Sequence, residues 1–201
     1  MRPDHDSHHN LSEEQGQLLV KLARQTLEEH FAKQIPQNEI DRLNAALTDP
    51  CFNLSCGTFV TLTIDGQLRG CIGNLTSSES LVSGVRRNTI NAAFHDPRFS
   101  PLSVSDLDRI AIEVSILSEP RQLHYRDPAD LLKKLRPNID GVIIRKDLAS
   151  ATFLPQVWEQ LPQPQDFLAH LCRKAGLTPD AWRNKQLEVS TYQVQYFEEH
   201  K

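Results

Sequence analysis

A cysteine between two glycines is the residue whose type and setting point most directly to chemistry. It lies in the segment Leu68-Arg69-Gly70-Cys71-Ile72-Gly73. A thiolate acts as a nucleophile, a redox centre or a metal ligand, and a neighbouring arginine favours the thiolate and holds an anionic substrate group. The segment therefore predicts a catalytic Cys71, or alternatively a small buried thiol in a strand whose glycines serve packing or a bulge. The predicted ligand-binding residues of this segment are Arg69, Gly70 and Gly73.

A nucleophilic cysteine needs a base close to it in space, and the base is usually a histidine. His95 is the preferred candidate for this catalytic role, and its alternative is a helix-terminal residue that favours the helix dipole. Asp96 and Arg98 follow in the same loop and are predicted to contact a ligand, because loops often carry binding residues. The alternative is that Asp96 and Arg98 pair with each other or cap the loop.

Glu113 is a third catalytic candidate, because it interrupts an otherwise apolar strand. A carboxylate that faces the core must be paired or protonated, which makes it either a general acid or base or the structural partner of an arginine such as Arg69. A carboxylate that faces solvent carries little meaning. The structural pair is the favoured interpretation.

A hairpin is predicted to present the cysteine. Asp65-Gly66 lies between β-rich runs at 58–64 and 67–73, and such a pair suits a two-residue turn with positive φ values. Arg69 and Cys71 alternate with Leu68, Gly70 and Ile72 along the second strand, so the arginine and the thiol are predicted to lie on the same face.

The other helices and strands are predicted from capping residues and from the period of the apolar positions. Ser12 and Gln15 form a capping-box pattern before a helix predicted over 13–33. Ser78 is predicted to cap a helix that runs to about Phe94. The remaining predicted elements are a helical piece at 40–47, a strand at 109–117, a helix after Asp127, strands at 142–145 and 151–154, a helix at 166–175 that ends at Gly176, and one long strand at 187–197.

The order of these elements favours an α+β fold with mixed or antiparallel sheets flanked by helices, because strands and helices do not alternate in a regular βαβ rhythm. A chain of 201 residues is expected to form one compact domain, with or without two lobes. Residues 1–11 are predicted to be a disordered polar tail, and residues 12–201 to be the domain.

Composition excludes several classes of protein. The net charge is −4, with acidic and basic residues interspersed, so no nucleic-acid partner is expected. The sequence has no run of about 18 apolar residues, no apolar N-terminal core and only four irregularly spaced cysteines, which favours a cytoplasmic chain without a membrane span. No metal or cofactor is predicted, because the sequence lacks compact zinc-ligand spacing and the nucleotide, hydrolase and metalloprotease motifs.

Five segments together resemble the AMMECR-one domain family, and in order they cover about residues 12 to 198. They are Leu68-Arg-Gly-Cys-Ile-Gly73, Ala92-Ala-Phe-His-Asp-Pro-Arg-Phe-Ser-Pro-Leu102, Glu113-Val-Ser-Ile-Leu-Ser-Glu-Pro120, Ala151-Thr-Phe-Leu-Pro-Gln-Val157 and Phe167-Leu-Ala-His-Leu-Cys-Arg-Lys-Ala-Gly-Leu177. Asn74 departs from the small hydroxyl residue expected at its position. The resemblance implies an α+β fold with a larger and a smaller lobe and a cleft near the glycine-cysteine segment.

The resemblance also implies partners. Microbial members of the family are associated with a Memo-type protein and a radical SAM protein, which suggests a shared modification or metabolic pathway, whereas the family's biochemical activity is not established. The expected function is a pathway enzyme or accessory that holds a small anionic molecule in a cleft formed by 68–73 and 95–98, with Cys71 as the reactive group. The alternative is a non-catalytic module that docks a Memo-type or radical SAM protein.

Overall fold

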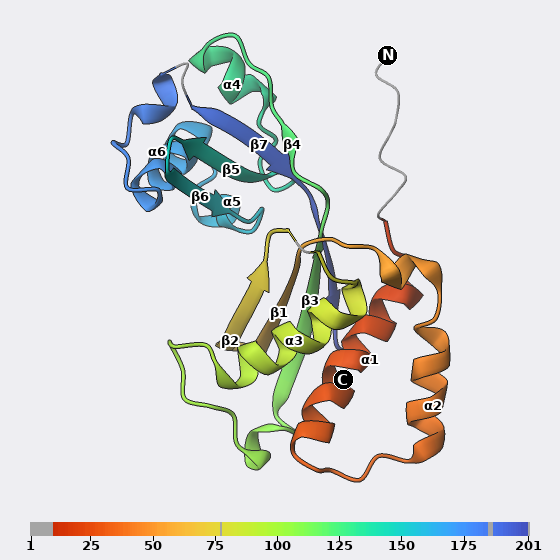
Figure 1. Cartoon of the computed structure of the whole chain (residues 1–201). Coiled ribbons are helices and arrows are strands. Elements are labelled where there is room, and N and C mark those ends of the chain that lie inside the picture. The colour runs from red at the N-terminus through yellow and green to blue at the C-terminus, as the bar shows by residue number, and fades with distance from the viewer. Residues whose placement is uncertain (1–9, 77, 185–186, 201) are drawn as a thin grey trace. The chain divides into compact units, whose positions relative to one another are not determined.

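The computed structural model describes residues 10–76, 78–184 and 187–200. The chain divides into two compact units, the first formed by the residues up to Leu117 together with those from Gln195 onward, and the second by Ser118–Val194 (Figure 1). Each unit combines helices with a four-stranded sheet, which confirms the predicted α+β class. Within the described ranges, no helix is both long enough and apolar enough to cross a membrane.

Leu11 belongs to the folded part of the first unit, although it lies in the stretch predicted as a tail. Residues 1–9 of that stretch lie outside the described residues. Leu11 is buried, its N–H donates to Gln195 Oε1 (3.0 Å), and its carbonyl accepts from Gln195 Nε2 (3.1 Å). The first unit therefore includes Leu11, which lies just before the predicted start of the domain at residue 12.

In its described residues, the first unit has three α-helices, of which the first and the third begin at serine caps and the second begins after Pro36. They are α1 (Glu13–His30), α2 (Gln37–Ala46) and α3 (Leu81–Phe94). The predicted capping box starts α1, because the Gln15 N–H donates to Ser12 Oγ (3.2 Å) and the Ser12 N–H donates to Gln15 Oε1 (2.9 Å). The cap of α3 is Ser80, whose Oγ accepts from the Ser83 N–H, and the prediction of Ser78 is wrong. Several hydroxyl residues precede this helix, and residue type alone does not decide which of them takes the extended cap conformation.

The first sheet packs one face against α1 and α3. Its strand order is β2-β1-β3-β8, formed by β1 (Thr58–Ile64), β2 (Gln67–Asn74), β3 (Ile110–Leu117) and β8 (Val194–Glu198). Asp65 and Gly66 have φ values of 51° and 75°, as the predicted turn requires. The buried side chains between sheet and helices include Leu19, Leu22, Val60, Leu62, Val85, Ile112 and Val114. The opposite face, hereafter the thiol face, carries Phe59, Thr61, Cys71, Glu113 and Ser115.

A β-bulge at Arg69 decides which face the cysteine occupies. The register between β1 and β2 shifts by one residue there, so that Cys71 pairs with Thr61. Directly paired residues share a face, and the thiol therefore lies on the face opposite α1 and α3. Without the extra residue Cys71 would pair with Val60, whose side chain is in the core.

The second unit has its own sheet and core. Its elements are β4 (Arg121–Gln122), α4 (Pro128–Lys134), β5 (Gly141–Lys146), β6 (Ala149–Phe153), α5 (Val157–Gln160), α6 (Pro164–Lys174) and β7 (Glu188–Tyr192), with the strand order β4-β7-β5-β6. The buried Trp158 ring stacks on Phe167 with centroids 3.7 Å apart. Gly176 has a φ of 76° after α6, as its predicted helix-ending role requires.

The prediction of one long strand over 187–197 is wrong, because β7 and β8 are separate strands in different sheets. The break falls at Gln193. Its N–H donates to Ser118 Oγ (2.9 Å), and its carbonyl accepts from the Ser118 N–H (2.9 Å). Alternation of apolar residues continues across this point, and periodicity therefore does not reveal the change of sheet.

Candidate functional site

Cys71 lies in a row of three polar side chains across the thiol face. The half-buried Cys71 Sγ accepts a hydrogen bond from Thr61 Oγ1 at 3.3 Å, and Thr61 pairs on its other side with Glu113. Neighbouring strands are about 4.8 Å apart, so the backbones at Cys71 and Glu113 are roughly 10 Å apart. A small molecule over Thr61 would lie between the two side chains.

Thr61 is a member of this row that sequence reasoning missed. Its alternation with Val60 and Leu62 places it on the face away from the core. Its position next to Cys71, however, depends on the bulge at Arg69, for which the sequence carries no clear signal.

The predicted structural partner of Glu113 is an arginine such as Arg69, and Arg69 is the wrong residue, because its guanidinium binds elsewhere. Glu113 Oε1 accepts from Ser115 Oγ (3.2 Å). Arg69 Nη1 donates to the Ser100 carbonyl (2.6 Å), and its Nη2 lies 3.8 Å from Asp106 Oδ2. Strict alternation would place the arginine and the thiol on one face, but the bulge at Arg69 interrupts it. The arginine thus holds the loop that follows α3.

Asp96 and Arg98 clamp the backbone of Cys71 at the edge of the sheet. Asp96 is buried, and its Oδ2 accepts from the Cys71 N–H at 2.9 Å. Arg98 Nη2 donates to Asp96 Oδ2 (2.6 Å) and to the Cys71 carbonyl (3.2 Å), and Arg98 Nε donates to Asp96 Oδ1 (2.9 Å). The Arg98 guanidinium, aided by backbone N–H donors, holds the pKa of the Asp96 carboxyl well below its usual range despite burial. This Asp96–Arg98 clamp covers an edge strand that would otherwise present unpaired backbone groups.

His95 follows α3 and is exposed. Its Nδ1 lies 3.1 Å from Asn91 Oδ1, and its N–H donates to the Asn91 carbonyl. Among the residues that the structure describes, no hydrogen bond joins His95 to Cys71. The loop that begins at His95 thus reaches the cysteine through Asp96 and Arg98.

Gly70 and Gly73 permit close packing. A Cβ at Gly70 would lie 2.0 Å from the Ala92 carbonyl oxygen of α3. A Cβ at Gly73 would lie 2.2 Å from the Thr58 carbonyl oxygen and 2.3 Å from the Phe59 ring. Both contacts are far inside van der Waals distance, so each glycine is needed for the approach of its neighbouring element.

The other cysteines are poorly suited to thiolate chemistry. Burial raises the pKa of Cys51 to about 11 and that of Cys56 to about 11, and it also raises the pKa of Cys172. Cys56 and Cys172 are buried. In the described part of the chain, no group of three or more His, Cys, Asp or Glu side chains is arranged to hold a metal ion.

These features define a class of α+β protein with two units, in which a half-buried thiol on the first sheet is held at its backbone by an aspartate–arginine pair. The chain belongs to the AMMECR1 family, whose family model matches residues 20–197. The family resemblance of the sequence is thereby confirmed.

The relatives of this chain include archaeal proteins of similar length. A protein of Methanothermobacter thermautotrophicus is 38% identical over 196 residues, which cover 94% of this chain and 96% of that protein. A protein of Thermofilum pendens is 36% identical over 205 residues, which cover 94% and 92% of the two chains. The crystal structure of the uncharacterized protein PH0010 from Pyrococcus horikoshii is similar, with a TM-score of 0.79, 34% identity and 94% coverage of each chain.

Proposed function

We propose that the thiol face binds a small anionic molecule beside Cys71, and that this molecule is the substrate or ligand of a pathway enzyme or accessory. The observation that carries the proposal is the combination of a partly accessible thiol with a rigidly held backbone, since the Asp96–Arg98 clamp bonds both the N–H and the carbonyl of Cys71. Preorganised groups of this kind are what a ligand site needs.

Arg98 is the residue proposed to attract the anion. Its Nε and Nη2 bind Asp96 and the Cys71 carbonyl, and in the described chain Nη1 has no such bond. The Arg98 side chain is 54% exposed, compared with 2% for Asp96. A carboxylate or phosphate at Nη1 would therefore lie next to the edge of β2 that carries the thiol.

Glu113 is proposed as the acid or base of the site. It lies across Thr61 from Cys71, and a small molecule bound over Thr61 would lie between the two side chains. His95 has no role in this proposal, because among the described residues no hydrogen bond joins it to Cys71.

Alkylation with two reagents tests the site. Iodoacetamide at pH 8 is expected to modify Cys71 at least about tenfold faster than the other three cysteines, because their raised pKa values and burial leave little accessible thiolate. Iodoacetate carries the same reactive carbon with a negative charge. The ratio of iodoacetate to iodoacetamide rates at Cys71 is expected to fall about threefold or more in Arg98→Gln, since the cation that attracts the anion is lost. Peptide mass spectrometry over time gives both rates.

The matched control is Arg136→Gln. Arg136 binds the buried Asp140 in the second unit as Arg98 binds Asp96, with an exposed fraction of 54% for each arginine. This variant should leave the ratio at Cys71 unchanged. An equal ratio in the native chain and Arg98→Gln would refute the anion site, and labelling of Cys71 no faster than Cys51 would remove its proposed reactivity.

The second candidate function is a protein-interaction module, and one exposed side chain favours it. Leu148 lies at the tip of the β5–β6 hairpin with a relative exposure of 103%, so its whole side chain is available to a partner. Memo-type and radical SAM proteins are the proposed partners. Leu148→Ser should weaken binding of a purified partner about tenfold in calorimetry, whereas Ile139→Ser, at a residue with 49% exposure, should not. Equal affinities would argue against docking through this hairpin.

A further inference from the structure

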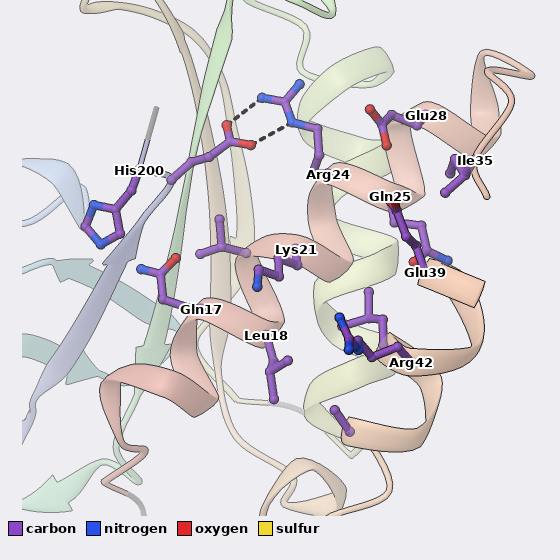
Figure 2. Close-up of a pocket in the computed structure, with 14 residues that line it drawn as sticks. Gln17, Leu18, Lys21, Arg24, Gln25, Glu28, Ile35, Glu39, Arg42 and His200 are labelled. Atoms are coloured by element: carbon purple, nitrogen blue, oxygen red, sulfur yellow. Dashed lines mark hydrogen bonds and ion pairs between the residues drawn. The ribbon is translucent and has the colours of Figure 1, made fainter. Parts of the chain in front are cut away.

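A groove between α1 and α2 lies apart from the thiol face and is large enough to hold a ligand. It has a volume of about 740 Å³, within the usual range of small-molecule sites (Figure 2). The α1 wall extends from Gln17 to Glu28, which is roughly 16 Å of helix at 1.5 Å per residue. Apolar side chains from both helices and from the connection between them line the groove, namely Leu18, Val20, Ile35, Leu43 and Ala46.

Two of the basic side chains that line the groove form no ion pair in the described chain. Arg24 already has partners, because its Nε donates to Glu199 (2.7 Å) and its two Nη atoms donate to two backbone carbonyls. Glu28 binds Lys33 (3.1 Å). In the described chain, Lys21 of α1 and Arg42 of α2 have no ion pair.

Both cations lie on exposed parts of the groove. Lys21 and Arg42 are exposed, and Arg42 extends from α2 towards α1 (Figure 2). Glu39 is the remaining acid of the lining, one turn before Arg42, and His200 is also there. Two cations without an ion pair in the described chain, Lys21 and Arg42, therefore face the one remaining acid, Glu39, in the groove. This local excess of positive charge contrasts with the net charge of −4 of the whole chain.

The lining of the groove suits a molecule with an apolar chain and an acidic end, because apolar side chains lie beside two cations that have no ion pair in the described chain. An extended alkyl chain buries apolar surface against this lining. A carboxylate at its end would pair with the two free cations.

We propose that the groove between α1 and α2 binds a long-chain carboxylate, with its alkyl chain along Leu18, Leu43 and Ala46 and its head group between Lys21 and Arg42. This site is separate from the proposed function at Cys71. Its ligand is recognised by a negative charge and an unbranched apolar chain.

Calorimetric titration of the full chain with dodecanoate, below its micellar concentration, tests the proposal. One saturable site per chain is expected. Dodecyltrimethylammonium has the same chain and the opposite charge, and should bind at least about tenfold more weakly. The double variant Lys21→Glu with Arg42→Glu should weaken dodecanoate about tenfold or more. The matched control, Lys133→Glu with Arg145→Glu on exposed cations of the second unit, should stay within about twofold.

A second variant tests the apolar part independently of charge. Ala46→Trp places a ring in the groove and should weaken dodecanoate about tenfold, with native circular dichroism as evidence of folding. The proposal is overturned if dodecanoate binding does not saturate, or if the Lys21/Arg42 double variant binds dodecanoate as tightly as the Lys133/Arg145 control. It is also overturned if dodecyltrimethylammonium binds as tightly as dodecanoate. Tighter binding of a synthetic acidic amphipathic helix would assign the groove to a protein. A dimer that Ala46→Trp dissociates, without dodecanoate binding, would assign it to a second copy of the chain.

Discussion

Gly70→Ala is expected to lower the free energy of unfolding by about 3 kcal/mol, a large effect for the addition of one methyl group. The added Cβ would lie 2.0 Å from the Ala92 carbonyl oxygen, which is a backbone atom in the last turns of α3. Backbone has no rotamer with which to yield, so α3 must move away from β2 and open the core between helix and sheet. Urea unfolding followed by circular dichroism measures the loss.

Gly84→Ala is the matched control, because Gly84 also lies where α3 meets the sheet. Its Cβ would lie 3.2 Å from Thr58 Oγ1, a side-chain atom, and alanine gains up to about 1 kcal/mol of helix propensity over glycine. We expect the free energy of unfolding to change by about 1 kcal/mol at most. Equal unfolding midpoints for the two variants would show that α3 does not press on Gly70 as described.

Asp96→Asn is expected to cost about 3 kcal/mol at pH 7, because it breaks the ion pair of a buried carboxylate. The native carboxylate accepts from the Cys71 N–H and the Arg98 N–H as well as from the guanidinium. An amide brings an NH₂ group into a site built of donors, and one buried donor loses its acceptor. Arg98 is 54% exposed, so water screens part of the loss.

The pH dependence of this difference has a definite sign. The pKa of Asp96 is lower in the folded chain than in the unfolded one, where it is about 3.9. Its stabilising contribution is therefore present in full above that unfolded value and is lost as the pH falls through the lower, folded value. The gap in unfolding free energy between native chain and Asp96→Asn should stay constant from neutral pH down to about 5 and shrink below about 4.

Asp140→Asn provides the matched comparison for Asp96→Asn. Asp140 is buried and accepts from the Arg136 N–H and guanidinium in the second unit. Both variants should lose stability, but only Asp96→Asn should accelerate hydrogen exchange at the Cys71 amide. Unchanged exchange at that amide in Asp96→Asn would contradict the Asp96–Arg98 clamp.

The parts of the fold that depend on neighbouring residues were predictable. The capping box at Ser12, the turn at Asp65-Gly66 and the helix end at Gly176 each follow from the conformation that one or two residues prefer. The α+β class followed in turn from the order of these elements. The change of sheet at Gln193 did not follow, because it depends on a partner, Ser118, that is distant in sequence.

The candidate site was predictable in its composition but not in its geometry. Proximity of the 95–98 loop to the cysteine segment was expected, and the structure brings Asp96 and Arg98 to the Cys71 backbone. The direction of Arg69 was not predictable, because one extra residue in β2 reverses which face each later side chain occupies. Registers are set by packing across strands, and periodicity within one strand does not contain that information.

The division of the chain has a consequence for the order in which its parts are made. Residues 118–194 form a unit of their own, while the first unit needs β8, which comes after them. Synthesis proceeds from the N-terminus, so the ribosome releases every strand of the second sheet before the fourth strand of the first. Until then the Leu11 N–H lacks its hydrogen-bond acceptor, the Gln195 side chain. The unit that begins first in the sequence is therefore the last to close.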